Sequence, residues 1–161
     1  MRLLTHNMLV CNVKACADTA GREAGLRPLN FPLRIVPEMD GVVIAKTVFS
    51  KKFMLHIMKS IDYAALAETT KEVRLDIYSS SISGQCNVML MGNARLNHPE
   101  VPILPEQIPE DLSEQDELLQ LIHQVIFDTN IVEGELVCNN CARSYPITHA
   151  VPNMLLEDDE M

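Results

Sequence analysis

The stretch Cys138-Asn139-Asn140-Cys141 has the spacing of a zinc knuckle, and Cys11-Asn12-Val13-Lys14-Ala15-Cys16 carries a second pair of cysteines near the start of the chain. Zinc in a structural site takes four ligands in a tetrahedron, and four thiolates complete that set. One ion held by both pairs would bring the two ends of the chain together. The residues between the pairs would then form an insertion, so the cysteines alone predict an architecture.

The composition indicates one domain, or one small domain that carries an insertion. The chain has 161 residues, of which 47% are hydrophobic and 4% aromatic. Its formal net charge of -9 would repel phosphate backbones, which disfavours direct nucleic-acid binding as a primary role. The same charge would favour a basic protein partner.

The lack of a recognisable signal peptide or membrane span, together with the cysteine usage, predicts an intracellular protein. No stretch approaches the roughly 18 apolar residues that span a bilayer, and the N-terminal residues do not resemble a signal peptide. Thiols stay reduced inside cells, so a closely spaced cysteine pair binds metal there more often than it forms a disulfide. The fifth cysteine, Cys86, is expected to be a free thiol without an assigned role.

The predicted fold class is α+β: a small zinc-ribbon-like antiparallel sheet domain built from both termini, with an inserted helical domain. The zinc-binding domain would comprise residues 1–40 plus 129–161. Within it we expect an extended segment over residues 3–16, and strands over residues 31–36, 131–137 and 144–151. In the knuckle, Ala142 stands where such turns often have glycine, which predicts some backbone strain.

The inserted domain, residues 41–128, is expected to be helical with a long irregular segment. One helix would begin at Ser50, with Phe53, Met54 and Met58 in a helix–helix core, and a second would run from Asp62 toward Val73. A proline-rich connection would follow, with short strands near Ile77 and over residues 88–91. A third helix would begin with Ser113 as N-cap and Asp116 at the capping-box position.

Two other chemistries of the cysteines are weighed against structural zinc. A catalytic zinc keeps an open coordination position, which four thiolates do not leave, although His6 or His149 could replace one ligand. A redox dithiol favours a helix N-terminus, whereas Cys138 and Cys141 lie between predicted strands. The sequence also lacks a phosphate-binding glycine loop, a Gly-x-Ser-x-Gly motif and a His-Glu-x-x-His motif. These observations predict a protein that is not an enzyme.

Both ends of the chain resemble a known family. The N-terminal Met1-Arg2-Leu3-Leu4-Thr5-His6-Asn7-Met8-Leu9, the four cysteines, and Val151-Pro152-Asn153-Met154-Leu155-Leu156 are similar to the multifunctional methyltransferase activator subunit of eukaryotes. Phe31-Pro32-Leu33-Arg34 and Glu133-Gly134-Glu135 resemble it too. Roughly the first 40 and last 50 residues carry the resemblance, and the region between about Tyr63 and Pro109 departs from it.

The resemblance implies a non-catalytic subunit that activates and stabilises its partners. Those partners would be class I S-adenosylmethionine-dependent methyltransferases that act on tRNA, ribosomal RNA and a translation release factor, bound as heterodimers. The methyltransferase, and not this chain, would bind S-adenosylmethionine, and RNA would be reached only through it. One structural zinc would be held by Cys11, Cys16, Cys138 and Cys141. The expected location is the cytoplasm and nucleus, with no membrane partner.

The resemblance also implies that a strand of the zinc domain extends the sheet of the enzyme, with apolar side chains beside it. The candidate partner-binding residues lie at the two ends of the chain: Leu4, Met8, Leu9, Val151, Pro152, Met154 and Leu155. The same residues could instead form the core of the small domain. The alternative function is a stand-alone zinc ribbon that binds nucleic acid, which would need a basic face.

Overall fold

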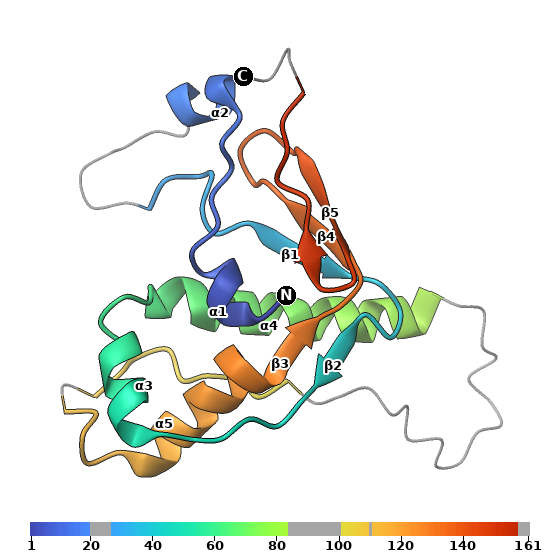
Figure 1. The fold of residues 1–161 in the computed structure, drawn as a ribbon. Coiled ribbons are helices and arrows are strands. Elements are labelled where there is room, and N and C mark those ends of the chain that lie inside the picture. Colours follow the sequence, from blue (N-terminus) through green and yellow to red (C-terminus); the bar gives the residue numbers. More distant parts are fainter. Residues whose placement is uncertain (20–26, 84–100, 110, 158–161) are drawn as a thin grey trace, which may run out of the picture.

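The chain folds into one half built on a sheet and another built on helices (Figure 1). The computed structural model describes residues 1–19, 27–83, 101–109 and 111–157. The helices are α1 (Leu3–His6), α2 (Lys14–Thr19), α3 (Lys51–Ile57), α4 (Tyr63–Ser83), α5 (Asp116–His123) and the π-helix η1 (Gln124–Asp128). The strands are β1 (Arg34–Pro37), β2 (Val42–Ile44), β3 (Thr129–Ile131), β4 (Gly134–Val137), β5 (Ser144–Thr148) and β6 (Val151–Pro152).

The larger sheet is antiparallel throughout and has the strand order β1-β4-β5-β6. Alternate residues of its strands face the core, because successive side chains of a strand point to opposite faces. Ile35, Leu136 and Tyr145 occupy paired positions across three strands, and all three side chains are buried. The predicted α+β class, with an antiparallel sheet built from both ends of the chain, is confirmed.

Gly134 allows β4 to lie close to β1. Its φ is +149°, and a Cβ at this position would come within 2.6 Å of the Val36 carbonyl oxygen. A side chain here would push the two strands apart, so only glycine fits without rearrangement. The strand pair that leads to the knuckle therefore depends on this residue.

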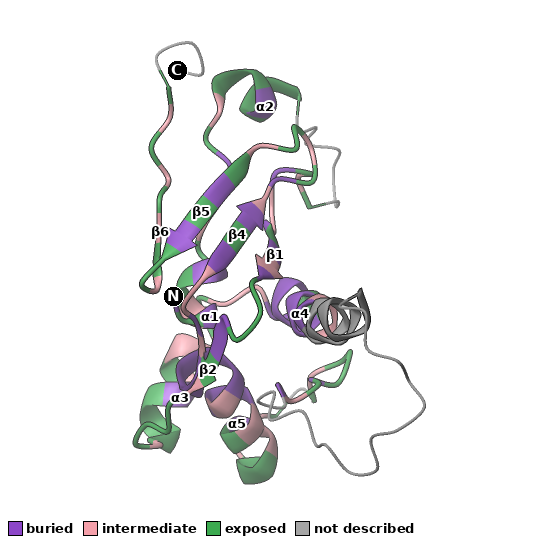
Figure 2. Cartoon of the chain, turned by 90° about the vertical axis from the view of Figure 1, so that its right-hand side faces the viewer, coloured by how far each residue is buried: buried purple, intermediate pink, exposed green. Residues whose placement is uncertain are grey.

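Helix α4 packs against β1, and its buried side chains include Leu66, Thr70 and Val73. In the other half, α3 packs against α5, and α1 packs against η1 and β3 (Figures 1 and 2). The apolar stripe of α5 continues into η1, so that Ile122 and Ile126 are both fully buried. One hydrophobic cluster joins the two halves.

Asp128, at the end of η1, holds the segment between β2 and α3. Its Oδ1 accepts hydrogen bonds from the Thr47 backbone N–H at 2.8 Å and from the Thr47 hydroxyl at 2.7 Å. The His123 Nε2 lies 3.3 Å from the same hydroxyl. Because Asp128 and His123 are buried, these bonds satisfy polar groups that would otherwise be costly inside the protein.

Several local expectations are wrong. The N-terminal segment is not continuously extended, since α1 and α2 lie within or overlap it. Helix α5 begins at Asp116 and not at Ser113, whose hydroxyl donates to Asp111 Oδ1 instead. Ile77 belongs to α4 and not to a strand. These differences arise because local side-chain bonds and tertiary packing override weak propensities.

The expected helix–helix core of α3 is correct only in part. Ser50 precedes α3 as expected but makes no side-chain cap bond, and Met54 is fully buried. Met58 is half-buried, whereas Phe53 remains 48% exposed although its ring packs near that of Phe127. Cys86 and the strand expected over residues 88–91 lie outside the described residues.

Candidate metal centre and partner surface

The fold brings four distant cysteine sulfurs together. Cys11 lies between α1 and α2, Cys16 lies in α2, Cys138 directly follows β4, and Cys141 lies in the turn before β5. Their Sγ atoms all lie within 4.8 Å of one another. Cys11 is 3.7 Å from Cys141 and Cys16 is 3.6 Å from Cys138, so each close approach joins the two ends of the chain.

These distances fit a tetrahedral zinc–thiolate site. With Zn–S bonds of about 2.3 Å, the sulfurs of a regular tetrahedron lie about 3.8 Å apart. A disulfide would need about 2.05 Å, and none of the four cysteines forms one. Within the part of the chain that the structure describes, no other group of three or more His, Cys, Asp or Glu side chains could hold a metal.

Polar groups around the cluster suit negatively charged sulfurs. Asn140 donates from Nδ2 to Cys16 Sγ at 3.2 Å and from its backbone N–H to Cys138 Sγ at 3.4 Å. The Tyr145 hydroxyl lies 3.1 Å from Cys11 Sγ, and to a thiolate it can only donate. Such partners orient metal ligands and favour their ionised form.

The ionisation of the free thiols depends on burial. Burial raises the pKa of Cys16 to about 12, although its bond from Asn140 opposes this, and burial also raises the pKa of Cys138. At Cys141 burial acts in the same direction, but the Arg143 backbone N–H and the neighbouring thiols outweigh it and lower the pKa. Metal binding at this site would therefore release protons at neutral pH.

The knuckle has the backbone strain that the sequence predicts. Ala142 has a φ of +58°, in the left-handed region that disfavours side chains with a Cβ. The turn is closed by the Ala142 N–H bound to the Cys138 carbonyl oxygen and by the Cys138 N–H bound to the Arg143 carbonyl oxygen. This geometry aims both sulfurs of the knuckle toward the N-terminal pair.

Neither histidine considered as a substitute ligand belongs to the cluster. His6 is fully buried, and its Nε2 lies 2.6 Å from the Leu33 carbonyl oxygen. His149 is exposed, at the turn between β5 and β6. The cluster therefore consists of cysteines alone.

The predicted partner-binding residues divide into two groups. Met8, Val151 and Leu155 are 56%, 64% and 77% exposed. The others are half-buried, and those that pack against the hydrophobic core are Leu4, Leu9 and Met154. The first group lies on the surface, whereas Leu4, Leu9 and Met154 contribute to the packing of the domain.

Strand β6 forms one edge of the larger sheet (Figure 2). The two-residue turn before it, His149-Ala150, has positive φ at both positions, as a type I′ hairpin requires. The Ala150 N–H donates to the Val132 carbonyl oxygen and the His149 N–H to Glu133 Oε1. These bonds fix the hairpin, so the edge of β6 and its exposed side chains are held in place.

The family described as Trm112p-like protein matches residues 2–148 of this chain. The chain belongs to the Trm112p-like family. The resemblance inferred from the two ends of the sequence is thereby confirmed.

Relatives of this Trm112p-like chain match it over its whole length. It is 32% identical to the multifunctional methyltransferase subunit trm112 of Schizosaccharomyces pombe, and the alignment covers the full length of both chains. It is 31% identical to the subunit TRM112 homolog A of Arabidopsis thaliana, again over both full lengths. A solved complex of Mtq2 and Trm112 from E. cuniculi aligns with 96% of this chain and 95% of the matched chain, at 13% identity and a TM-score of 0.43.

Two residues of the Trm112p-like site were missed by the sequence analysis. Asn140 lies inside the knuckle, and its side chain reaches Cys16 from the other end of the chain. Tyr145 is in β5, and only the fold places its hydroxyl beside Cys11. The position of Asn140 between two cysteines is a signal that could have found it, whereas nothing local points to Tyr145.

Proposed function

We propose that this chain is a non-catalytic subunit that activates and stabilises class I S-adenosylmethionine-dependent methyltransferases. The observation that carries the proposal is the full-length match to relatives that are named methyltransferase subunits. S-adenosylmethionine is bound by the partner in this proposal. The substrates proposed for the partners are tRNA, ribosomal RNA and a translation release factor, in the cytoplasm and nucleus.

The edge of β6 is the proposed docking strand. A free strand edge offers backbone N–H and C=O groups to a strand of another protein. Val151 and Leu155 supply exposed apolar surface beside it. The opposite edge, β1, suits this role less well, because helix α4 packs against it and its Arg34 is charged and exposed. Covering apolar surface on the enzyme would stabilise the folded enzyme by mass action.

We propose that the cysteine cluster holds one structural zinc ion. The ligands would be Cys11, Cys16, Cys138 and Cys141, which are all thiol donors and leave no open position. A closed site of this kind joins the segments before β1 to the turn between β4 and β5. The ion would thus support the sheet whose edge strand binds the partner.

Co-purification tests the proposed function. The tagged chain is expressed in its own cells, and the proteins that elute with it are identified and assayed for methyl transfer from S-adenosylmethionine. The expected result is one or more methyltransferases in stoichiometric amount, with activity that the enzyme alone lacks. Salt-dependent RNA binding without any co-purifying methyltransferase would instead favour the stand-alone nucleic-acid-binding ribbon.

Metal analysis tests the zinc proposal. The purified chain is expected to contain about one zinc per molecule, and Cys138→Ser should lose that zinc together with partner binding, because a three-thiolate site holds the ion weakly. Cys86→Ser is the matched control and should keep both. Zinc-free protein, or zinc content unchanged in Cys138→Ser, would contradict this assignment.

A further inference from the structure

Positive charge is concentrated in one segment of this acidic chain. Residues 41–61 contain four lysines and neither Asp nor Glu, whereas the rest of the chain has nine basic and 22 acidic residues. The segment forms β2, the connection held by Asp128, and α3 with the turn that follows it. The net charge of the whole chain therefore conceals a basic region.

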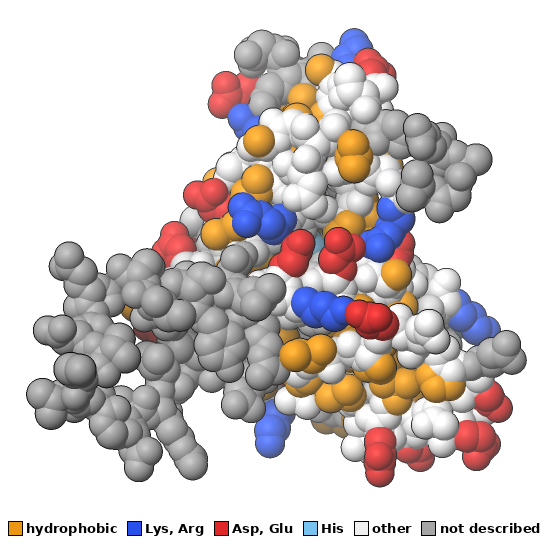
Figure 3. All heavy atoms as spheres, turned by 180° about the vertical axis from the view of Figure 1, so that it is seen from behind, with side chains coloured by type: hydrophobic (Ala, Val, Ile, Leu, Met, Phe, Trp, Pro, Cys, Tyr) orange, Lys and Arg blue, Asp and Glu red, His pale blue; other side chains and the backbone are white. Residues whose placement is uncertain are grey.

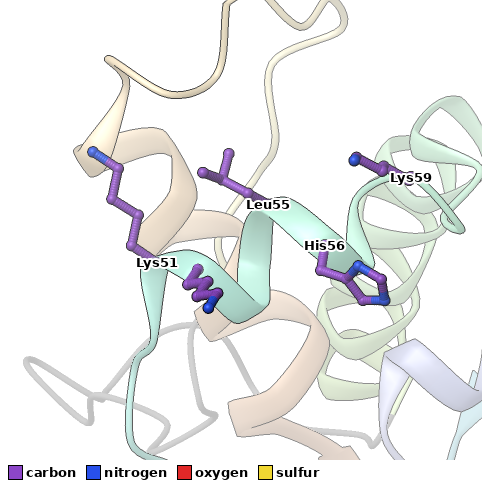
Figure 4. Close-up of a pocket in the computed structure, with 5 residues that line it drawn as sticks. Lys51, Leu55, His56 and Lys59 are labelled. Carbon is purple, nitrogen blue, oxygen red and sulfur yellow. The ribbon is translucent and has the colours of Figure 1, made fainter.

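The basic residues of α3 and the next turn share one surface with Leu55. We call it the α3 surface, and it comprises Lys51, Lys52, Leu55, His56 and Lys59. These residues line a pocket of about 560 Å³ (Figure 4). Lys52, His56 and Lys59 follow the i, i+4, i+7 spacing of one helical face, and all three are exposed. The spacing places two lysines and a histidine along one side of the helix, so their side chains are neighbours on the surface.

The structure leaves part of this positive charge uncompensated. The Lys51 Nζ lies 2.6 Å from Asp116 Oδ1, which ties α3 to α5. Among the residues that the structure describes, Lys52 and Lys59 have no ion-pair partner. Asp116, Glu114 and Asp111 act on Lys51 and offset its charge, so the uncompensated charge of this surface is that of Lys52 and Lys59.

Helix α3 also carries a partly exposed aromatic ring. Phe53, in the same turn as Lys52, is 48% exposed, and its ring centroid lies 5.6 Å from that of Phe127. Proteins that bind single-stranded nucleic acid combine cations for the phosphates with exposed aromatic rings on which bases stack. Lys52, Lys59 and this ring match such a site, and we take RNA as the ligand because the methyltransferases proposed as partners act on RNA.

The α3 surface belongs to the helical half of the molecule, whereas the proposed docking strand β6 is part of the larger sheet (Figure 2). Helix α3 lies at the end of the molecule opposite α2 and the cysteine cluster (Figure 1). Seen from behind, hydrophobic side chains gather in the half that contains α3 and α5 (Figure 3). A methyltransferase that extends the sheet along β6 would contact the sheet half directly, and the α3 surface lies in the other half.

We propose that the α3 surface binds the phosphate backbone of the RNA substrate in the heterodimer, with Lys52 and Lys59 as phosphate contacts and Phe53 as a stacking ring. The proposal rests on the proposed function, because it places this surface next to a methyltransferase that acts on RNA. It also revises the expectation that RNA is reached only through the partner.

The test compares two variants of equal charge. The heterodimer carries wild-type chain, the double variant Lys52→Gln/Lys59→Gln, or the control Lys14→Gln/Arg34→Gln, whose positions are exposed but outside the α3 surface. Binding of a fluorescent single-stranded RNA of about 16 nucleotides, the upper length of such binding sites, is measured from about 50 to 200 mM salt. Yield of heterodimer and zinc content report folding.

Loss of two phosphate contacts should flatten the salt dependence. Each contact on a single strand contributes about -0.7 to the slope of log K against log salt, so the slope should become less steep by about 1.4. At about 0.1 M salt this corresponds to a roughly 25-fold loss of affinity. The control variant should change the slope and the affinity much less than the lysine variant does. Phe53→Leu should weaken binding without changing the slope.

Three results would overturn the proposal. The first is equal affinity and slope for wild type and the lysine variant, with the heterodimer intact, which would leave the proposed function standing. The second is an equal loss in the control, which would mean that only net charge matters. The third is binding of a polyglutamate peptide as tightly as RNA and with the same loss in the lysine variant. That result would indicate that the natural ligand of this surface is an acidic protein. If no methyltransferase co-purifies, the proposed function fails, and the same titration of the full chain alone decides the RNA contact.

Discussion

Replacing His6 with glutamine should remove a specific part of the pH dependence of stability. His6 is fully buried, and a carbonyl oxygen can only accept, so its Nε2–H donates to the Leu33 carbonyl oxygen at 2.6 Å. Its Nδ1 is buried without a hydrogen-bond partner. Protonation would place a charge and an unsatisfied N–H in the core, where both are unfavourable.

The magnitude follows from the two pKa values. Burial lowers the pKa of His6 from 6.5 to about 4, although its bond to Leu33 opposes the shift. The folded state therefore binds this proton less readily than the unfolded state, so the stabilisation is complete above pH 6.5 and is lost as the pH falls toward 4. Between about pH 7 and pH 5 the loss is about 2 kcal/mol, and it approaches about 3 kcal/mol near pH 4.

Urea unfolding at about pH 7 and pH 5 measures this loss. His6→Gln keeps an N–H donor near the Nε2 position but does not titrate, so the wild type should lose about 2 kcal/mol more than the variant. Acid also protonates the cysteine cluster, but that effect is common to both proteins and cancels in the comparison. Parallel losses in the two proteins would refute the reasoning, because His6 would then titrate as it does in the unfolded chain.

Three further substitutions test the site and the partner surface. Tyr145→Phe removes the hydroxyl 3.1 Å from Cys11 Sγ and should weaken zinc binding roughly 10- to 100-fold in a chelator competition; unchanged affinity would mean that the hydroxyl does not support the ligand. Ala142→Gly relieves a φ of +58° and should stabilise the protein by about 0.5–1 kcal/mol in urea unfolding, whereas a loss of stability would contradict the strain. Leu155→Asp, at a 77% exposed position, should change stability by less than about 0.5 kcal/mol yet abolish co-purification of the methyltransferase. Its control is Met39→Asp, at a position 76% exposed, and loss of the partner in both variants would argue against β6 as the docking strand.

Spacing in the sequence was enough to predict the cysteine cluster and strands on both sides of the knuckle. The single strands expected over residues 131–137 and 144–151 are each divided in the structure, the first between β3 and β4 and the second between β5 and β6. Two closely spaced pairs at opposite ends of a chain leave few arrangements that satisfy tetrahedral ligation, and alternating apolar residues on both sides of the knuckle indicate strands. The conformation of Ala142 was predictable for the same reason, because the geometry of the turn requires a left-handed residue whether or not glycine is present.

The extents of the helices were predicted less well. The hydroxyl of Ser113 binds Asp111 instead of capping a helix, and the pairing of Asp116 with Lys51 depends on α3 lying beside α5. Local sequence offers several hydrogen-bonding choices to such residues, and only packing selects among them. The short helices α1 and α2 are likewise too short to be stable alone, so their existence depends on the surrounding fold.

The sequence by itself determined which atoms could meet a metal, because ligand type and spacing are local properties. The tertiary structure alone decided what lies around them and which surfaces remain available. Tyr145 reaches Cys11, and His6 loses access to water, through contacts between residues far apart in the chain. Exposure is decided in the same way: Leu155 and Phe53 remain partly open while Met154 packs against the core, because burial depends on every element that packs nearby and not on the residue alone.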